Sequence, residues 1–114
     1  MRKKIIKKPW GSEEIIEINN KFMFKKLFMK KNHQCSLQYH NVKKESVLVL
    51  SGKLRVMIKK NKKTINKILT KGQNILIKPK TIHRMRAVTN CTYLEASTPE
   101  INDVVRIEDD YKRV

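Results

Sequence analysis

Short runs in which apolar and polar residues alternate are the feature that most constrains how this chain folds. They recur along the sequence between turn residues, whereas helical spacing of apolar residues is nowhere sustained. Ser51-Gly52 and Lys71-Gly72 suit tight turns, and the lysine-rich tract 59–63 suits a hairpin tip. We therefore predict an all-β sheet, closed or sandwiched, of about ten strands. The predicted strands are 14–18, 22–29, 35–39, 46–50, 54–58, 64–69, 74–78, 83–88, 92–97 and 104–107.

The length of the sequence and its uniform composition along the chain indicate a single domain, 1–114. A chain of 114 residues can bury one core, and it contains no linker, repeat or low-complexity segment. No stretch is apolar enough to span a bilayer, and the start, MRKKIIKK, lacks the apolar core of a signal peptide. We expect a cytoplasmic protein without a membrane partner. Cys35 and Cys91 form no CxxC motif and are expected to be reduced and buried.

The net charge of +17 is typical of proteins that bind polyanions. However, lysine outnumbers arginine 21 to 6, although arginine is the better ligand for phosphate and bases. Lys, Ile and Asn together supply 43 residues and Ala only 2, which is typical of a codon bias toward A and T. We interpret the charge as a solvated lysine coat, with nucleic-acid binding as the alternative. The prediction is no specific nucleic-acid partner, and some attraction for small anions.

Four polar residues near strand ends suggest a metal site. Gln38 and His40 are two residues apart, so on a strand they project from one face, and Glu45 can return to the same point from the next strand. With His83 as a fourth ligand, the mixed nitrogen and oxygen set suits one divalent ion, whether Zn, Mn, Fe, Co or Ni. Taken singly, each residue could equally be a polar group at a strand end.

The spacing of these residues resembles the two signature motifs of the cupin superfamily. The first motif runs from Asn32, in place of a glycine, through Gln38, His40 and Glu45 to Gly52, and the second from Gly72 to His83. Asn tolerates the positive φ of the replaced glycine, and Lys80 stands where a further glycine is usual. The resemblance implies a cupin fold, that is, a double-stranded β-helix or jelly-roll barrel.

A narrower resemblance covers nearly the whole chain. KPWGSEE, SLQYH with Glu45, LVLSG, TIHR and VVRIEDDYKR are similar to the cupin domain of type II mannose-6-phosphate isomerases, which usually follows a guanylyltransferase domain. In that family a glutamine, a histidine, a glutamate and a later histidine bind the metal, which corresponds to Gln38, His40, Glu45 and His83. Where the family has two histidines and an arginine, this chain has Asn41, Val42 and Lys43, and family His and Trp become Ser46 and Val47.

The resemblance implies a metal-dependent isomerase that interconverts an aldose and a ketose phosphate. Lys43, Arg84 and Arg106 are candidates for contacts to the phosphate or to the enediolate, and Lys43 and Glu95 are the catalytic candidates. Two alternatives stay open: a metal-bound cupin of other chemistry, such as an oxygenase, lyase or epimerase, and a sugar-binding module without turnover. The expected partner is a small sugar phosphate, and a homodimer is one expected form.

Overall fold

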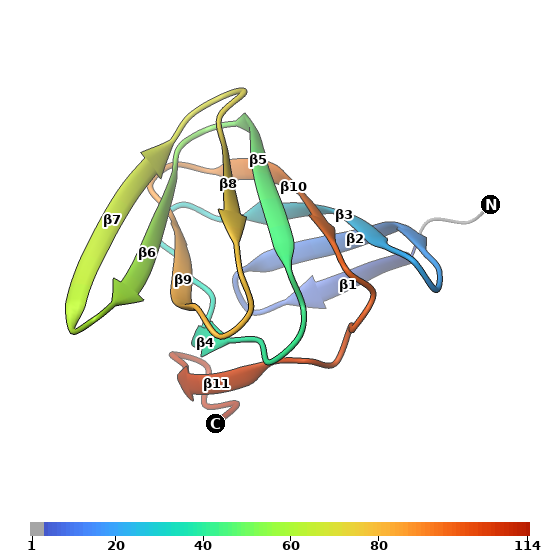
Figure 1. Cartoon of the computed structure of the whole chain (residues 1–114). Coiled ribbons are helices and arrows are strands. Elements are labelled where there is room, and N and C mark those ends of the chain that lie inside the picture. Colours follow the sequence, from blue (N-terminus) through green and yellow to red (C-terminus); the bar gives the residue numbers. More distant parts are fainter. Residues whose placement is uncertain (1–3) are drawn as a thin grey trace.

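The computed structural model describes residues 4–114, which form eleven β-strands arranged in two antiparallel sheets (Figure 1). These residues contain no helix, so the predicted all-β class is confirmed. The strands are β1 (Lys4–Lys8), β2 (Gly11–Ile18), β3 (Met23–Met29), β4 (Leu37–Tyr39), β5 (Glu45–Ser51), β6 (Leu54–Lys60), β7 (Lys63–Leu69), β8 (Asn74–Ile77), β9 (Ile82–Ala87), β10 (Cys91–Ser97) and β11 (Val105–Glu108).

The order of the strands brings distant parts of the sequence together. The six-stranded sheet has the order β1-β2-β3-β10-β5-β8, and the five-stranded sheet has the order β11-β4-β9-β6-β7. The late strand β10 thus lies between β3 and β5, and β9 lies between β4 and β6. Figure 1 shows the two sheets facing each other, with β4, β5 and β9 converging at one end. The residues predicted to bind metal lie on or next to these three strands.

The core consists of side chains from the inner faces of both sheets. Val47 and Val49 of β5 and Tyr93 of β10 come from one sheet, whereas Val56 and Met85 come from the other. Alternate residues along these strands are buried, as the sequence pattern predicts. Burial of this apolar surface is the main favourable contribution to folding. Cys35 and Cys91 lie in the same core as free thiols, which confirms their expected state.

One strand was not predicted. β1 has the sequence KIIKK, without a regular alternation, and it pairs with β2 from Lys4↔Ile15 to Lys8↔Gly11 at the edge of the six-stranded sheet. An edge strand with exposed side chains needs no apolar face, so pattern analysis does not detect it. The ten predicted strands all exist, with ends displaced by a few residues.

Positive φ angles occur at the turns that the sequence indicates. Asn32 has φ of 65°, as expected for the residue that replaces the first motif glycine. Asn61 and Lys62, at 50° and 66°, form the tip of the β6–β7 hairpin predicted from the lysine tract. Gly52, at 82°, cannot be replaced, since a Cβ atom there would lie 2.1 Å from the carbonyl oxygen of Asn90. These turns set the strand register on which the site depends.

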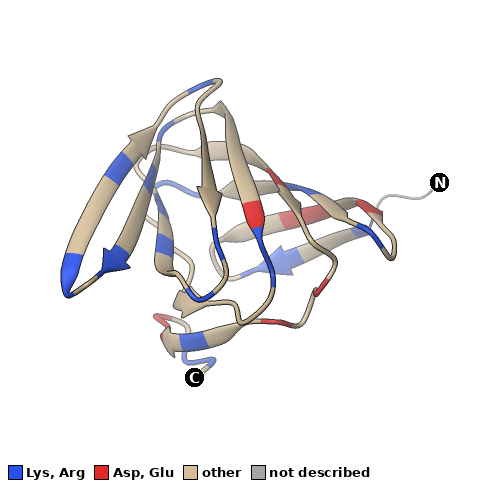
Figure 2. Cartoon of the chain, in the orientation of Figure 1, with Lys and Arg blue, Asp and Glu red and all other residues tan. Residues whose placement is uncertain are grey.

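The basic residues are spread over both sheets, whereas the acidic residues lie on the six-stranded sheet and in the segment from residue 100 onward (Figure 2). Lys and Arg occur on strands of each sheet and in the loops between them, which agrees with a general lysine coat. The part of the chain that the structure covers includes no helix long and apolar enough to cross a bilayer.

Lys80 provides a test of the turn geometry. It has φ of 64°, a conformation that costs a residue with a Cβ atom about 1–2 kcal/mol. Lys80→Gly should therefore raise the free energy of unfolding by about 0.5–1 kcal/mol, after the larger entropy of glycine in the unfolded chain is subtracted. The control is Lys78→Gly in the same loop, which has no positive φ and should destabilise. Urea unfolding that ranks Lys80→Gly below the wild type would contradict this turn geometry.

Candidate metal centre

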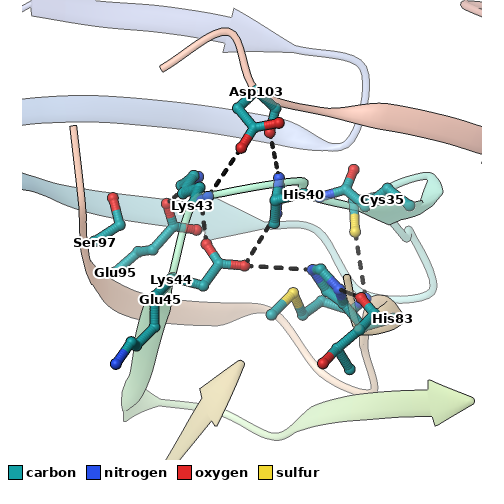
Figure 3. A network of polar contacts seen from close by, with 12 residues as sticks. Cys35, His40, Lys43, Lys44, Glu45, His83, Glu95, Ser97 and Asp103 are labelled. Atoms are coloured by element: carbon teal, nitrogen blue, oxygen red, sulfur yellow. Dashed lines mark hydrogen bonds and ion pairs between the residues drawn. The ribbon is translucent and has the colours of Figure 1, made fainter. Parts of the chain in front are cut away.

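His40, Glu45 and His83 form a buried cluster where the two sheets converge (Figure 3). The Oε1 atom of Glu45 lies 3.4 Å from Nε2 of His40 and 3.3 Å from Nε2 of His83. The three side chains are at most 3% exposed, and their ligand atoms all lie within 4.8 Å of one another. Glu45 begins β5, His83 is in β9, and His40 directly follows β4, so three strands from both sheets supply the cluster.

Both imidazole rings are oriented by their second nitrogen. Nδ1 of His40 contacts the backbone oxygen of Asp103, and Nδ1 of His83 lies 2.8 Å from the backbone oxygen of Thr81. A carbonyl oxygen only accepts, so each Nδ1 carries the proton, and in the neutral ring Nε2 keeps a free lone pair. Neither Nε2 atom has a hydrogen-bond partner within the described residues, although both are buried. Two imidazole lone pairs beside a carboxylate are a donor set that suits a divalent metal ion.

Asp103 fixes the loop that carries His40. Its carboxylate accepts hydrogen bonds from the backbone N–H groups of Asn41, Val42 and Lys43, at 3.0, 2.7 and 2.9 Å. Figure 3 shows Asp103 beside Lys43 and His40. These three bonds hold the pKa of Asp103 at about 2. The same residue contacts the His40 ring through its backbone oxygen, so one residue orients both the ring and the chain after it.

Gln38 lies beside the cluster and stays a predicted ligand. On β4 it is paired with His83 of β9, and it lines the same cavity as His40 and Glu45. Its amide oxygen accepts a hydrogen bond of 2.6 Å from the hydroxyl of Ser36, which is fully buried. An oxygen with two lone pairs can accept this bond and still coordinate a metal ion.

A cavity of about 490 Å³ opens in front of the cluster, and Lys43 and Glu95 line it. The Nζ atom of Lys43 lies 3.3 Å from Oε2 of Glu95 and 3.4 Å from Oε2 of Glu45, so the ammonium bridges the two carboxylates (Figure 3). Both Lys43 and Glu95 are buried. The structure therefore brings the two catalytic candidates together, next to the predicted ligands.

The charges in this cavity shift one another's protonation. Burial and then the charge of Glu45 raise the pKa of Glu95 to about 7, against the opposing effect of Lys43 and Lys25. Burial would lower the pKa of Lys43, but Glu95 and Glu45 raise it. Burial would raise the pKa of Glu45, but His40, His83 and Lys43 hold it well below its usual range. At neutral pH Glu45 is thus an ionised carboxylate, Lys43 is an ammonium, and Glu95 is near its titration point.

The two arginine candidates lie in different places. Arg84 alternates with His83 and Met85 along β9 and so lies on the outer face of the sheet. Its Nε donates to the backbone oxygen of Cys35, and its guanidinium is within 4.0 Å of Glu108 and Asp110. This arrangement gives Arg84 a structural role and separates it from the cavity. By contrast, Arg106 of β11 lines the cavity next to Gln38.

Three residues of this region, Asp103, Glu13 and Lys25, were not predicted from the sequence. Asp103 was not recognised because its contacts come from a loop distant in sequence. Glu13 and Lys25 are buried and line the cavity, 2.9 Å apart. The only signal for Lys25 was its position between Met23 and Leu27 on the inward face of β3.

Comparison with known proteins identifies the family. Residues 1–110 match the model of the family described as "Mannose-6-phosphate isomerase C-terminal". This chain belongs to that family. Among curated proteins, the chain is similar to alginate biosynthesis protein AlgA from Pseudomonas syringae pv. tomato and from Pseudomonas aeruginosa. Each alignment has 28% identity and covers 93% of this chain. The chain spans 22% of the length of these relatives.

Solved structures show the same fold. The capsular polysaccharide assembling protein CapF from Staphylococcus aureus superposes with a TM-score of 0.81 at 16% identity, over 94% of this chain and 34% of that one. An RmlC-like cupin from Shewanella frigidimarina gives 0.76 at 17% identity, over 89% and 87%. Oxalate decarboxylase from Bacillus subtilis gives 0.82 at 12% identity, over 92% and 30%. The fold is therefore the predicted cupin jelly roll, and the resemblance to type II mannose-6-phosphate isomerases is confirmed.

The Asp103 carboxylate tests how the ligands are oriented. Asp103→Ala would release three backbone N–H groups next to His40, so metal affinity should fall by about 10-fold, the lower end for groups that orient a ligand. Glu108→Ala, which removes an exposed carboxylate on β11, is the control and should leave the affinity unchanged. The measurement is competition between the protein and a chromophoric chelator for Zn²⁺ or Co²⁺. Equal affinities for wild type and Asp103→Ala would show that the ring needs no such support.

Proposed function

We propose that this chain is a metal-dependent sugar-phosphate isomerase of the mannose-6-phosphate type. The observation that carries the proposal is the pair of buried, unpartnered Nε2 atoms of His40 and His83 beside Glu45, at the end of a cavity that also contains Lys43 and Glu95. Membership of the family supports the choice of reaction, because the family's description is the C-terminal part of a mannose-6-phosphate isomerase.

The proposed ligands are His40, Glu45, His83 and Gln38, and the donor set suits Zn, Co, Mn, Fe or Ni. A divalent ion bound there would supply Lewis acidity at the substrate oxygens. Four protein ligands would leave coordination positions for those oxygens on the side of the cavity.

Lys43 and Glu95 are proposed to handle the proton and the developing charge. Conversion of an aldose to a ketose removes a proton from carbon 2 to give an enediolate, moves the hydroxyl proton from oxygen 2 to oxygen 1, and returns a proton to carbon 1. A carboxyl group with a pKa of about 7 suits both transfers at carbon, since it can take and return a proton near neutral pH. The Lys43 ammonium, 3.3 Å from Oε2 of Glu95, would stabilise the negative charge that forms beside it.

Arg106 is the proposed contact for the phosphate. Arg106 lines the cavity, and its buried Nε atom donates no hydrogen bond within the described residues. A guanidinium with free donors binds phosphate in a fork geometry. The proposed partner is thus a small sugar phosphate, for a protein that works in the cytoplasm and either alone or as a homodimer.

A sugar-binding module without turnover is the second candidate. Asn41 and Val42 are exposed in the loop where the family has histidines, so this chain lacks two imidazoles next to the site. Lys43 keeps the charge of the family arginine but lacks its planar fork. Turnover measurements distinguish the two candidates.

The test is interconversion of mannose 6-phosphate and fructose 6-phosphate by protein loaded in turn with Zn, Co, Mn, Fe and Ni. Lys43→Ala should lower kcat by about 10- to 1000-fold, the usual effect of removing one stabilising donor, and Lys43→Arg should retain most activity. The control is Lys44→Ala, because Lys44 is adjacent, exposed and directed away from the cluster (Figure 3).

A protein that binds metal but shows no turnover with any of the five ions would reject the isomerase and favour the binding module. Equal activity for Lys43→Ala and Lys44→Ala would instead remove Lys43 from the mechanism.

A further inference from the structure

We infer that Glu13 and Lys25 form a second ligand contact in the same cavity, which binds adjacent hydroxyl groups of a polyhydroxylated substrate. The inference rests on the proposed function, because it takes the sugar phosphate as the occupant of the cavity. It assigns a role to two residues that neither the metal cluster nor the proposed proton transfer uses.

The two residues are placed at the cavity by neighbouring strands. Glu13 is on β2 and Lys25 on β3, and their side chains are 10% and 8% exposed. Oε1 of Glu13 accepts a hydrogen bond of 2.9 Å from Nζ of Lys25. Lys25 is paired across the sheet with Glu95 of β10, so the contact lies beside the proposed acid–base group, on its side away from β5.

The hydrogen bonds of this pair are incomplete. An ammonium group has three donors, and within the described residues Lys25 makes only the bond to Glu13. Oε2 of Glu95 is 4.0 Å from the Lys25 nitrogen, too far for a hydrogen bond. The other carboxylate oxygen of Glu13, Oε2, lies 3.9 Å from Nζ of Lys8, also too far for a hydrogen bond. The pair thus offers donors and an acceptor to whatever occupies the cavity.

This combination selects hydroxyl groups over carboxylates. A hydroxyl both donates and accepts, so one hydroxyl can accept from Lys25 while its neighbour donates to Glu13. A carboxylate of the ligand would meet the negative charge of Glu13, and like-charge repulsion disfavours that contact. The geometry therefore fits a sugar better than a small dicarboxylic acid.

A purely structural pair is the competing explanation. Buried ion pairs add little to stability, and apolar residues of similar size often replace them without loss. Lys25 sits between Met23 and Leu27 on an inward face that is otherwise apolar, so a methionine there would complete the core pattern. A charged pair that faces a cavity is better explained by a ligand.

The experiment measures ligand binding by titration calorimetry on the metal-loaded full chain. The probes are mannose 6-phosphate, its single-deoxy analogues and inorganic phosphate. Glu13→Gln and Lys25→Gln should weaken binding of mannose 6-phosphate by about 10-fold, since each leaves a buried polar group unpaired, and should leave inorganic phosphate unaffected. At least one deoxy analogue should bind the wild type about 10-fold more weakly and lose less affinity in Glu13→Gln.

The matched control is Lys26→Gln, the next residue of β3, which is exposed on the opposite face. Unchanged binding of mannose 6-phosphate by both variants would overturn the inference, and so would equal losses for sugar phosphate and inorganic phosphate. If Lys25→Gln fails to fold, Glu13→Gln and the deoxy series on the wild type decide the matter. Sugar binding that depends on Glu13 without turnover would reject the isomerase but keep this contact, whereas turnover that is indifferent to Glu13→Gln would do the reverse.

Discussion

The buried carboxylate of Glu45 is the interaction on which the site depends. A carboxylate in the dry interior is costly unless cations or hydrogen-bond donors surround it. Here the Lys43 ammonium lies 3.4 Å from Oε2 of Glu45, and a divalent ion held by Glu45, His40 and His83 would complete that environment. Glu45 begins β5, His83 is in β9, and His40 and Lys43 lie in the loop after β4. The charge of Glu45 is therefore balanced only when the two sheets meet at this point.

Five charged residues of the cavity form a chain of contacts in which acidic and basic side chains alternate. Glu13, Lys25, Glu95, Lys43 and Glu45 follow one another with contacts of 2.9, 4.0, 3.3 and 3.4 Å. Each carboxylate therefore has an ammonium beside it, and each ammonium has two carboxylates. Such a row keeps opposite charges adjacent in a poorly hydrated space, where their interaction is stronger than in water. All five residues line the same cavity, so one ligand can contact both Glu45 and the Glu13–Lys25 pair.

The sequence predicts the features of the candidate site that short-range geometry defines. Strand alternation places Gln38 and His40 on one face, and the resemblance to the cupin motif implies the positive φ at Asn32, which is 65° in the structure. Prediction from the sequence failed where tertiary contacts decide. In β3, the sequence MFKKLFM is apolar on both faces, which hid the inward direction of Lys25. For Arg84, by contrast, a sequence rule is sufficient. Arg84 directly follows His83, and adjacent strand residues point to opposite faces, so Arg84 points away from the ligands.

The most direct test of the account is X-ray absorption spectroscopy of the zinc-loaded protein. The geometry predicts a first shell of nitrogen and oxygen atoms at about 2.0–2.2 Å, with outer-shell scattering from two imidazole rings. That scattering should fall to one ring in His83→Ala and in His40→Ala alike. A shell of oxygen atoms alone, or sulfur at about 2.3 Å from Cys35, would contradict the assignment of His40, Glu45 and His83 as the metal centre.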